Sequence, residues 1–234
     1  MAVVAALAGV FLGSPPVHGA PPPRDSVFAA GRGIESQVSV AVGGLVDAMD
    51  PRAAAGASLR VPQFTLDGRF GLGKGWSAVG HLNTILAINE LDLGLSWSFP
   101  VFGELAGIAQ FQAGAFVGML GSFGFESRVI APEFRPLVGL SWPSGSLRWS
   151  VRGELVFAGP YVTTLGDATS TLATPPPLAN WNIALIMENL MKNDRLWYAG
   201  LVMMGSTASY QNWLLFPDTS YYDYYPRVVG GYEF

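Results

Sequence analysis

The chain has two histidines and no cysteine, and this limits the chemistry that its side chains can perform. His81 precedes two serines on the next apolar run, Ser96 and Ser98, and a serine activated by a histidine is the arrangement used in acyl transfer. The sequence has no Gly-rich phosphate loop and no close group of His or carboxylate residues with the spacing of a metal site. It therefore offers one weak catalytic candidate, and it predicts no metal and no cofactor.

A larger set of polar residues is more informative, because its members alternate with apolar neighbours. Acids, bases and amides occur in it together, and the charges nearly balance. Mixed rings of this kind are typical of a water-filled interior that small solutes cross with weak charge preference. The set consists of Asp67, Arg69, His81, Asn83, Asp92, Gln110, Gln112, Glu126, Arg128, Arg148, Arg152, Glu154, Asn182 and Glu188.

The elements that must position these residues have a period of two. From Leu91 to Phe99 every second residue is large and apolar, and the residues between them are small or polar. A β-strand points such alternate side chains to opposite faces. The same pattern covers residues 38–42, 64–72 and 147–157. Weaker versions cover residues 76–88, 123–131, 138–142, 181–187, 197–203 and 228–234.

The composition excludes an ordinary soluble surface. Half of the residues are apolar and 13% are charged, whereas a soluble surface carries roughly 25–35% charged residues. Lysine occurs twice, as Lys74 and Lys192. A net charge of −4 without a basic cluster argues against nucleic-acid binding.

Two faces of the alternating strands must therefore meet two different environments. The face opposite the large apolar residues is mostly Gly, Ser, Ala, Asn and Gln, not the Lys and Glu of a water-exposed sandwich. A closed barrel in a bilayer turns its apolar face outward and its polar face inward, with no unpaired backbone in lipid. The aromatic residues fit this, because most fall near strand ends, as an interfacial girdle requires: Trp76, Trp97, Phe99, Trp142, Trp149, Trp181 and Trp197.

Two stretches favour a competing structure. Residues 105–125 and 196–217 each run over 20 residues without a charged residue, so each alone is compatible with a membrane-spanning helix of about 20 residues. The first includes Gly114 and Gly118, a small-xxx-small spacing that is seen in packed membrane helices. Against the helix, both stretches contain several amide or hydroxyl residues and adjoin convincing strands.

The N-terminal stretch is typical of an export signal. Residues 1–13 are apolar and uncharged, too short for a membrane span, and small residues at Val17 and Gly19 suit cleavage after Gly19. We expect residues 1–19 to be a signal peptide, residues 20–33 a short N-terminal segment and residues 34–234 the barrel.

The chain resembles bacterial outer-membrane β-barrel proteins of the porin-like superfamily. The signal-like start, the amphipathic strands and the C-terminal aromatic pair Tyr232 and Phe234 carry the resemblance. In that superfamily, a terminal Phe with an aromatic or apolar residue two positions before it resembles the signal that the barrel-assembly machinery reads. The resemblance implies a Gram-negative outer membrane, with its lipids and that machinery as partners. The family pattern usually has Gly five residues before the end, where this chain has Val229.

The expected fold is all-β, an antiparallel transmembrane barrel. Spanning strands of about 9–11 residues give an estimate of about twelve strands, with ten as the alternative. The runs named above give an odd number if residues 105–125 are also a strand, although bacterial barrels have an even one. Short links are expected at residues 73–75, 100–103, 132–136, 143–146 and 192–195, and long links at residues 47–56, 158–179 and 206–226.

The leading functional prediction is a passive channel or uptake pore for small solutes. The alternative is a structural or adhesion barrel, in which arginines such as Arg128, Arg148 and Arg152 pair with Glu126 and Glu154 and fill the lumen. We expect no enzymatic activity, because the His-x-Ser spacing of outer-membrane lipid hydrolases is replaced by His81-Leu82-Asn83.

A tyrosine-rich segment stands apart from these patterns. Residues 221–225 contain four tyrosines, which could stack on sugars or bind a partner. Anchoring at the membrane interface and packing over the barrel mouth is the simpler interpretation.

Overall fold

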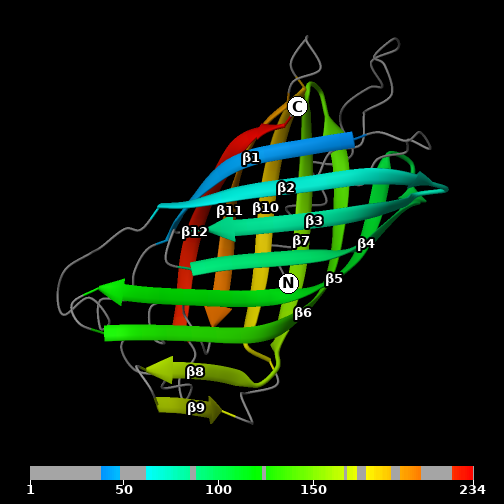
Figure 1. Ribbon diagram of the computed structural model, residues 1–234. Helices are drawn as coiled ribbons and strands as arrows, with labels where there is room; N and C mark the ends of the chain where they lie inside the picture. The colour runs from blue at the N-terminus through cyan, green and yellow to red at the C-terminus, as the bar shows by residue number, and fades with distance from the viewer. Residues whose placement is uncertain are drawn as a thin grey trace.

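The computed structural model of the chain is a closed antiparallel barrel of ten strands, extended at one edge by a two-stranded hairpin (Figure 1). The structure describes residues 38–47, 62–84, 88–122, 125–165, 168–172, 178–190, 196–206 and 223–233. The barrel strands are β1 (Val38–Asp47), β2 (Pro62–Gly73), β3 (Trp76–Thr84), β4 (Ile88–Phe102), β5 (Leu105–Ser122), β6 (Phe125–Ser144), β7 (Leu147–Ala158), β10 (Asn180–Leu190), β11 (Leu196–Ser206) and β12 (Asp223–Glu233). The all-β antiparallel architecture predicted from the sequence is confirmed, and the barrel closes with ten strands, the lower of the two expected numbers.

Each barrel strand pairs with its neighbours in chain order, and the first strand closes on the last. Val42 of β1 lies opposite Tyr232 of β12 on one side and opposite Leu66 of β2 on the other. Figure 1 shows β1–β5 crossing in front of β7 and β10–β12, as the two walls of a tilted barrel do. In the described part of the wall, every barrel strand has a paired neighbour on both sides, so its backbone groups can pair within the sheet.

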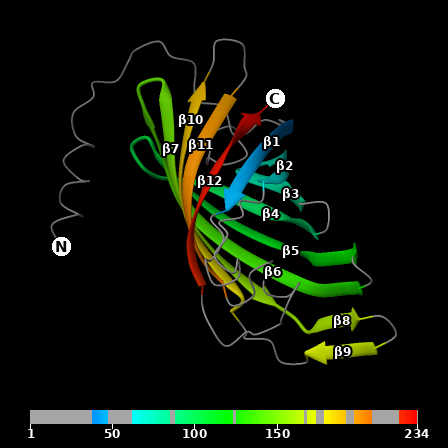
Figure 2. The same cartoon turned by 90° about the vertical axis from the view of Figure 1, so that its left-hand side faces the viewer.

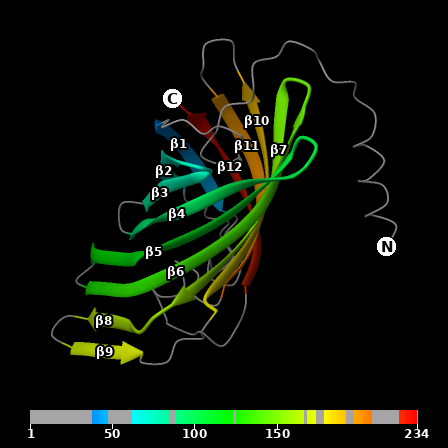
Figure 3. The same cartoon turned by 90° about the vertical axis from the view of Figure 1, so that its right-hand side faces the viewer.

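The remaining two strands, β8 (Tyr161–Leu165) and β9 (Ala168–Leu172), form a hairpin beside β6 (Figure 2). The first half of β6 pairs with β8, from Ser127 to Ile130, and its second half pairs with β7. Figure 3 shows the hairpin continuing the sheet below β6. Residues 158–179, expected to be a long irregular link, thus contain regular structure.

Tight turns lie at one end of the barrel. The β2–β3 turn has three successive residues with positive φ, at 92° for Gly73, 53° for Lys74 and 81° for Gly75, a conformation that glycine adopts without steric cost. Gly103 and Gly145, each with positive φ, lie in the β4–β5 and β6–β7 turns. The described strand ends at Asp47, Pro62, Ser206 and Asp223 lie at the opposite end. Residues 48–61 and 207–222, and the link expected at 192–195, lie outside the described residues.

The barrel wall separates apolar from polar side chains. Leu91, Leu93 and Leu95 of β4 are between 49% and 64% exposed, whereas Asp92 and Ser96, which alternate with them, are 0% exposed. Because successive side chains of a strand point to opposite faces, the leucines face outward and the polar residues face the lumen. Other barrel strands repeat this arrangement, with outward Ile183 and Leu185 on β10 against inward Asn182 and Glu188.

Aromatic side chains collect near the tight-turn end. Trp76 stacks on Trp97 with ring centroids 6.1 Å apart, and Trp97 contacts Phe99 at 4.7 Å. Trp142 lies opposite Trp149, and Trp197 lies opposite Tyr232. At the other end, Trp181 lies 6.0 Å from Tyr224. The aromatic residues expected near strand ends therefore lie there, most of them at the tight-turn end and one pair at the other.

Strand β6 corrects one sequence expectation. Residues 123–131 and 138–142 were expected to be two strands joined by a turn at 132–136, but Phe125–Ser144 is one strand of 20 residues. Pro132 and Pro136 occupy alternate positions of this strand whose side chains point to the outer face. The β6–β7 pairing skips Arg135 and Pro136, because proline has no N–H to donate. Merging the two runs removes the odd strand number.

Two further expectations are settled by the strands. Residues 105–125, for which a helix was the competing interpretation, form β5 as far as Ser122. Among the described residues, no helix is long and apolar enough to cross a membrane. Strand β12 begins at Asp223 and contains Pro226, both inside the link expected at 206–226. The expected signal peptide and N-terminal segment, residues 1–33, lie outside the described residues.

An arginine on the outer face should destabilise the barrel in lipid. We expect Leu93→Arg to lower the free energy of unfolding by about 2–4 kcal/mol, because a cation then faces hydrocarbon. Ser144→Arg, at the exposed end of β6, is the control and should stay within about 0.5 kcal/mol of the wild type. Denaturant unfolding in phospholipid vesicles measures both, and equal effects would contradict a lipid-facing position for Leu93.

Candidate functional site

The barrel interior contains a cavity of about 170 Å³ that is lined by both polar and apolar side chains. Nine of the ten barrel strands contribute to its lining, with charged or amide groups from β2, β3, β4, β5, β6, β7, β10 and β12. Apolar residues of the same lining include Leu137, Ile186 and Met204. This volume is several times the volume that one water molecule needs. The cavity is therefore large enough for water and small solutes.

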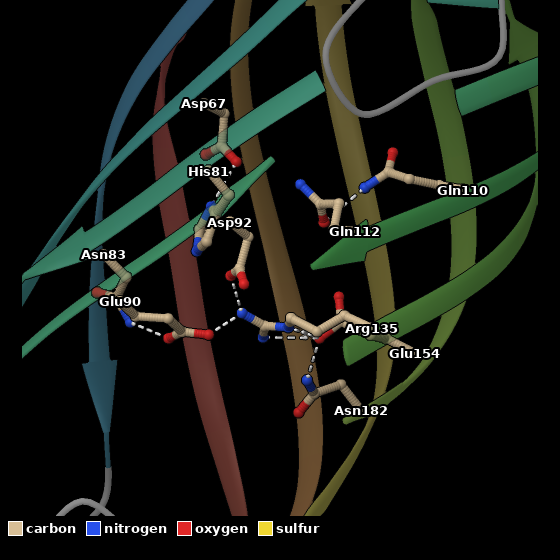
Figure 4. A network of polar contacts seen from close by, with 10 residues as sticks. All are labelled: Asp67, His81, Asn83, Glu90, Asp92, Gln110, Gln112, Arg135, Glu154 and Asn182. Carbon is tan, nitrogen blue, oxygen red and sulfur yellow. Dashed lines mark hydrogen bonds and ion pairs between the residues drawn. The ribbon is translucent and has the colours of Figure 1, made fainter. Parts of the chain in front are cut away.

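The Arg135 guanidinium is the centre of the described interior polar contacts (Figure 4). Its Nη1 donates to Asp92 Oδ2 at 2.7 Å and also contacts Glu90 Oε1. Its Nη2 and Nε donate to Glu154 Oε1 at 2.8 and 3.2 Å. One cation therefore joins carboxylates from β4 and β7, with the fork geometry that makes arginine effective in such pairs.

Two amides extend this set of contacts along the wall. Asn182 Nδ2 on β10 donates to Glu154 Oε1 at 3.0 Å, and Asn83 Nδ2 on β3 donates to Glu90 Oε2 at 3.4 Å. The Arg135 network, as we name it, consists of Asn83, Glu90, Asp92, Arg135, Glu154 and Asn182. It runs from β3 to β10 and crosses over β5 without using a side chain of that strand.

Strand β5 permits this crossing because it carries a glycine there. Gly114 lies opposite Asp92 on one side and opposite Glu133 on the other. A Cβ at Gly114 would collide with the Asp92 carboxylate and with the backbone of β4. The glycine, noted in the sequence for its helix-packing spacing, thus lets acidic side chains from the two neighbouring strands approach each other.

His81 pairs with a carboxylate and not with a serine. Its Nδ1 donates to Asp67 Oδ1 at 2.7 Å. Ser96 lies opposite Ser77 in the β3–β4 register, four residues along β3 from His81, which is about 13 Å at the rise of a strand. A histidine base must lie within about 3 Å of its nucleophile, so these residues do not form a serine–histidine pair.

Arg69 occupies the interior closer to the tight-turn end. Its Nε donates to Ser77 Oγ at 2.9 Å, and its Nη2 donates to Ser98 Oγ at 2.7 Å. Ser98 therefore serves as a hydrogen-bond acceptor for a buried arginine. Neither serine that the sequence offered as a nucleophile lies beside His81.

The structure brings most of the sequence-predicted polar residues into the interior. Each of them lines the cavity or is buried at a position whose side chain faces the lumen. These residues are Asp67, Arg69, His81, Asn83, Asp92, Gln110, Gln112, Arg148, Arg152, Glu154, Asn182 and Glu188. Within this group, Gln110 donates to Gln112 at 2.9 Å.

The structure corrects the prediction that Arg128 faces the lumen. Its side chain is exposed and lies on the same face of β6 as exposed Ile130, whereas Val129 between them is buried. It therefore does not pair with interior carboxylates. The side chain of Glu126, expected on the same face, lies outside the described residues.

Four interior charges were not predicted from the sequence. Glu90, Glu133, Arg135 and Arg227 are each at most 9% exposed. Extending the alternation of β4 by one step from Asp92 finds Glu90. Glu133 and Arg135 share the parity of buried Leu137, but they were placed in a turn because prolines flank them.

Two regions expected to serve assembly or binding are described in part. Tyr232 is 55% exposed on the outer face of β12, and Phe234 lies outside the described residues. In the tyrosine-rich segment, Tyr224 is 66% exposed and packs near Trp181. This contact agrees with interfacial packing.

Comparisons with known proteins give structural likenesses only. No family model and no curated protein matches the chain. Three similar structures are the translocator domain of the autotransporter NalP from Neisseria meningitidis (12% identity, 86% of this chain and 89% of that one, TM-score 0.34), OccK5 from Pseudomonas aeruginosa (10%, 87% and 68%, 0.24) and an anion-selective porin from Comamonas acidovorans (11%, 85% and 99%, 0.22). At these TM-scores the barrel assignment rests on this chain's own strand pairings.

Removing the central guanidinium should be costly. We expect Arg135→Met to lower the free energy of unfolding by about 3–5 kcal/mol, because it leaves buried carboxylates without their cation. The matched control on the same strand is Arg128→Met, which should change stability by about 0.5 kcal/mol or less, since Arg128 is exposed. Denaturant unfolding of the folded barrels compares them, and equal losses would rule out a central role for Arg135.

Proposed function

We propose that this chain is a bacterial outer-membrane barrel that conducts small hydrophilic solutes through its lumen. The observation that supports this most directly is a cavity with charged and amide side chains in its lining, inside a wall whose outer face is apolar. Barrels of eight strands are just wide enough for side chains to fill, and diameter grows with strand number. Ten strands leave room for a narrow aqueous path.

The lining favours small solutes of either charge. Asp67, Glu90 and Glu154 face the cavity together with Arg135, Arg152 and Arg227. Because acids and bases are interspersed, no single sign of charge dominates the path. We therefore expect weak selectivity and low conductance.

The arrangement of the strand ends supports an orientation. Outer-membrane barrels have short periplasmic turns and longer external loops, so the end with the Gly73–Gly75 turn would face the periplasm. The aromatic girdle around that end would contact outer-membrane lipids. Recognition of Tyr232 and Phe234 by the barrel-assembly machinery remains part of this proposal.

A closed structural or adhesion barrel is the second candidate. Glu188 and Arg148 are 1% and 3% exposed, which is unusual for charged groups beside open water. The ion pairs of Arg135 also join strands across the interior. In this case the polar side chains fill the lumen and hold the wall rigid.

Conductance in planar bilayers tests the channel. We expect discrete conductance from the wild type, and Asn182→Trp should reduce it severalfold because Asn182 lines the cavity. The control is Ile183→Trp, the next residue on β10, which is 54% exposed on the outer face and should leave conductance unchanged. Heat-modifiable gel mobility verifies that each protein is folded.

The result discriminates between the two candidates. Folded protein that inserts without conductance above background would exclude the channel and support the closed barrel. Equal effects of the two tryptophan substitutions would show that current does not pass through this cavity.

A further inference from the structure

Three carboxylates from two strands converge beside Arg135. Glu90 and Asp92 on β4 and Glu133 on β6 each offer one oxygen, and these oxygens lie within 4.8 Å of one another. Ca²⁺ binds carboxylate oxygens at about 2.3–2.6 Å, so oxygens on opposite sides of one ion are about 5 Å apart. All three groups can therefore reach a single ion.

Glu133 provides a second, independent observation. Its side chain is 9% exposed, and its buried Oε2 has no hydrogen-bond partner. Asp92 Oδ1 is likewise buried without a hydrogen-bond partner, although Oδ2 of the same carboxylate binds Arg135. A buried carboxylate oxygen without a partner is costly. Glu133 thus combines a buried oxygen that lacks a hydrogen-bond partner with a carboxylate that lies near two acids held by Arg135.

The acidic groups at this point also outnumber the guanidinium that contacts them. Glu90, Asp92, Glu133 and Glu154 supply four negative charges around this point when ionised. Arg135 contacts three of these groups, and Arg152 lines the cavity two residues from Glu154 on the same face of β7. Among these four acids, Glu133 is the one that Arg135 does not contact, and a divalent cation would place positive charge beside it.

We propose that Glu90, Asp92 and Glu133 bind one Ca²⁺ ion inside the barrel wall. Hard oxygen ligands are those that Ca²⁺ prefers, and this ion tolerates irregular geometry and completes its coordination with water. Glu90 also lines the cavity, so water and the ion reach the site from the lumen. Gly114 between Asp92 and Glu133 keeps the two carboxylates close.

The bound ion would link β4 to β6 across β5. Arg135 already makes this link through Asp92 and Glu90, and the ion adds Glu133 to it. The expected consequence is higher stability of the longest strands of the barrel. This role does not depend on conduction, so the site and the channel are tested separately.

Calorimetric titration with CaCl₂ tests the site directly. The full chain is folded in a non-ionic detergent, which offers no anionic lipid to bind the ion, treated with EDTA and dialysed. We expect saturable binding of about one Ca²⁺ per chain and a higher unfolding temperature with Ca²⁺ than with EDTA. The decisive variant is Glu133→Gln, and the control is Glu188→Gln, a buried interior carboxylate on β10 outside the triad.

The variants decide where the ion binds. Glu133→Gln should weaken Ca²⁺ binding by roughly tenfold or more and abolish the shift in unfolding temperature, because affinity follows the number of charged ligands. Glu188→Gln should bind as the wild type does. If Glu133→Gln does not fold, Asp92→Asn replaces it.

Either of two results would overturn the proposal. One is a wild-type barrel that shows no saturable Ca²⁺ binding and no shift in unfolding temperature. The other is a Glu133→Gln barrel that binds Ca²⁺ as tightly as Glu188→Gln does. A barrel that binds Ca²⁺ and conducts no current would leave the site standing and remove only the channel.

Discussion

The pairing of β1 with β12 closes the sheet, so that neither the first nor the last barrel strand is left as a free edge. Once the sheet closes, strand alternation assigns every side chain to the outer face or to the lumen. The outward leucines of β4 and the buried Asp92 and Ser96 between them are direct consequences. The low charge content follows as well, since only about half of the wall positions accept a polar group.

Because the polar residues of the closed wall face the lumen, their charged groups are buried together in the interior. Acids placed there lose much of their solvation and need cations or hydrogen-bond donors nearby. Arg135 meets this need for Glu90, Asp92 and Glu154, and Arg69 is satisfied by the hydroxyls of Ser77 and Ser98. Charge pairing and an aqueous path therefore compete for the same space. The width that the side chains leave between them decides how much of the lumen water can fill.

The sequence predicted the fold through its period of two, and it predicted the inward side wherever the alternation was strict. It failed in β6, where charged residues occur on both parities: Glu126 and Arg128 on one, Glu133 and Arg135 on the other. Pro132 and Pro136 suggested a turn, because proline normally interrupts a central strand. Only the register with β5, which places Gln112 opposite Arg135, determines which parity faces the lumen. The Arg135 network was therefore not predictable from spacing alone.

The position of the Arg135 network in the chain has a consequence for folding. Its members lie on β3, β4, β6, β7 and β10, which together with β5 are successive strands of the wall. The pairing of Val42 with Tyr232, in contrast, joins residues near the two ends of the barrel sequence. Contacts between distant residues carry the larger loop-closure entropy and form slowly. The ion pairs can thus assemble in a sheet that is still open, and the β1–β12 seam would then close around an interior whose charges are already matched.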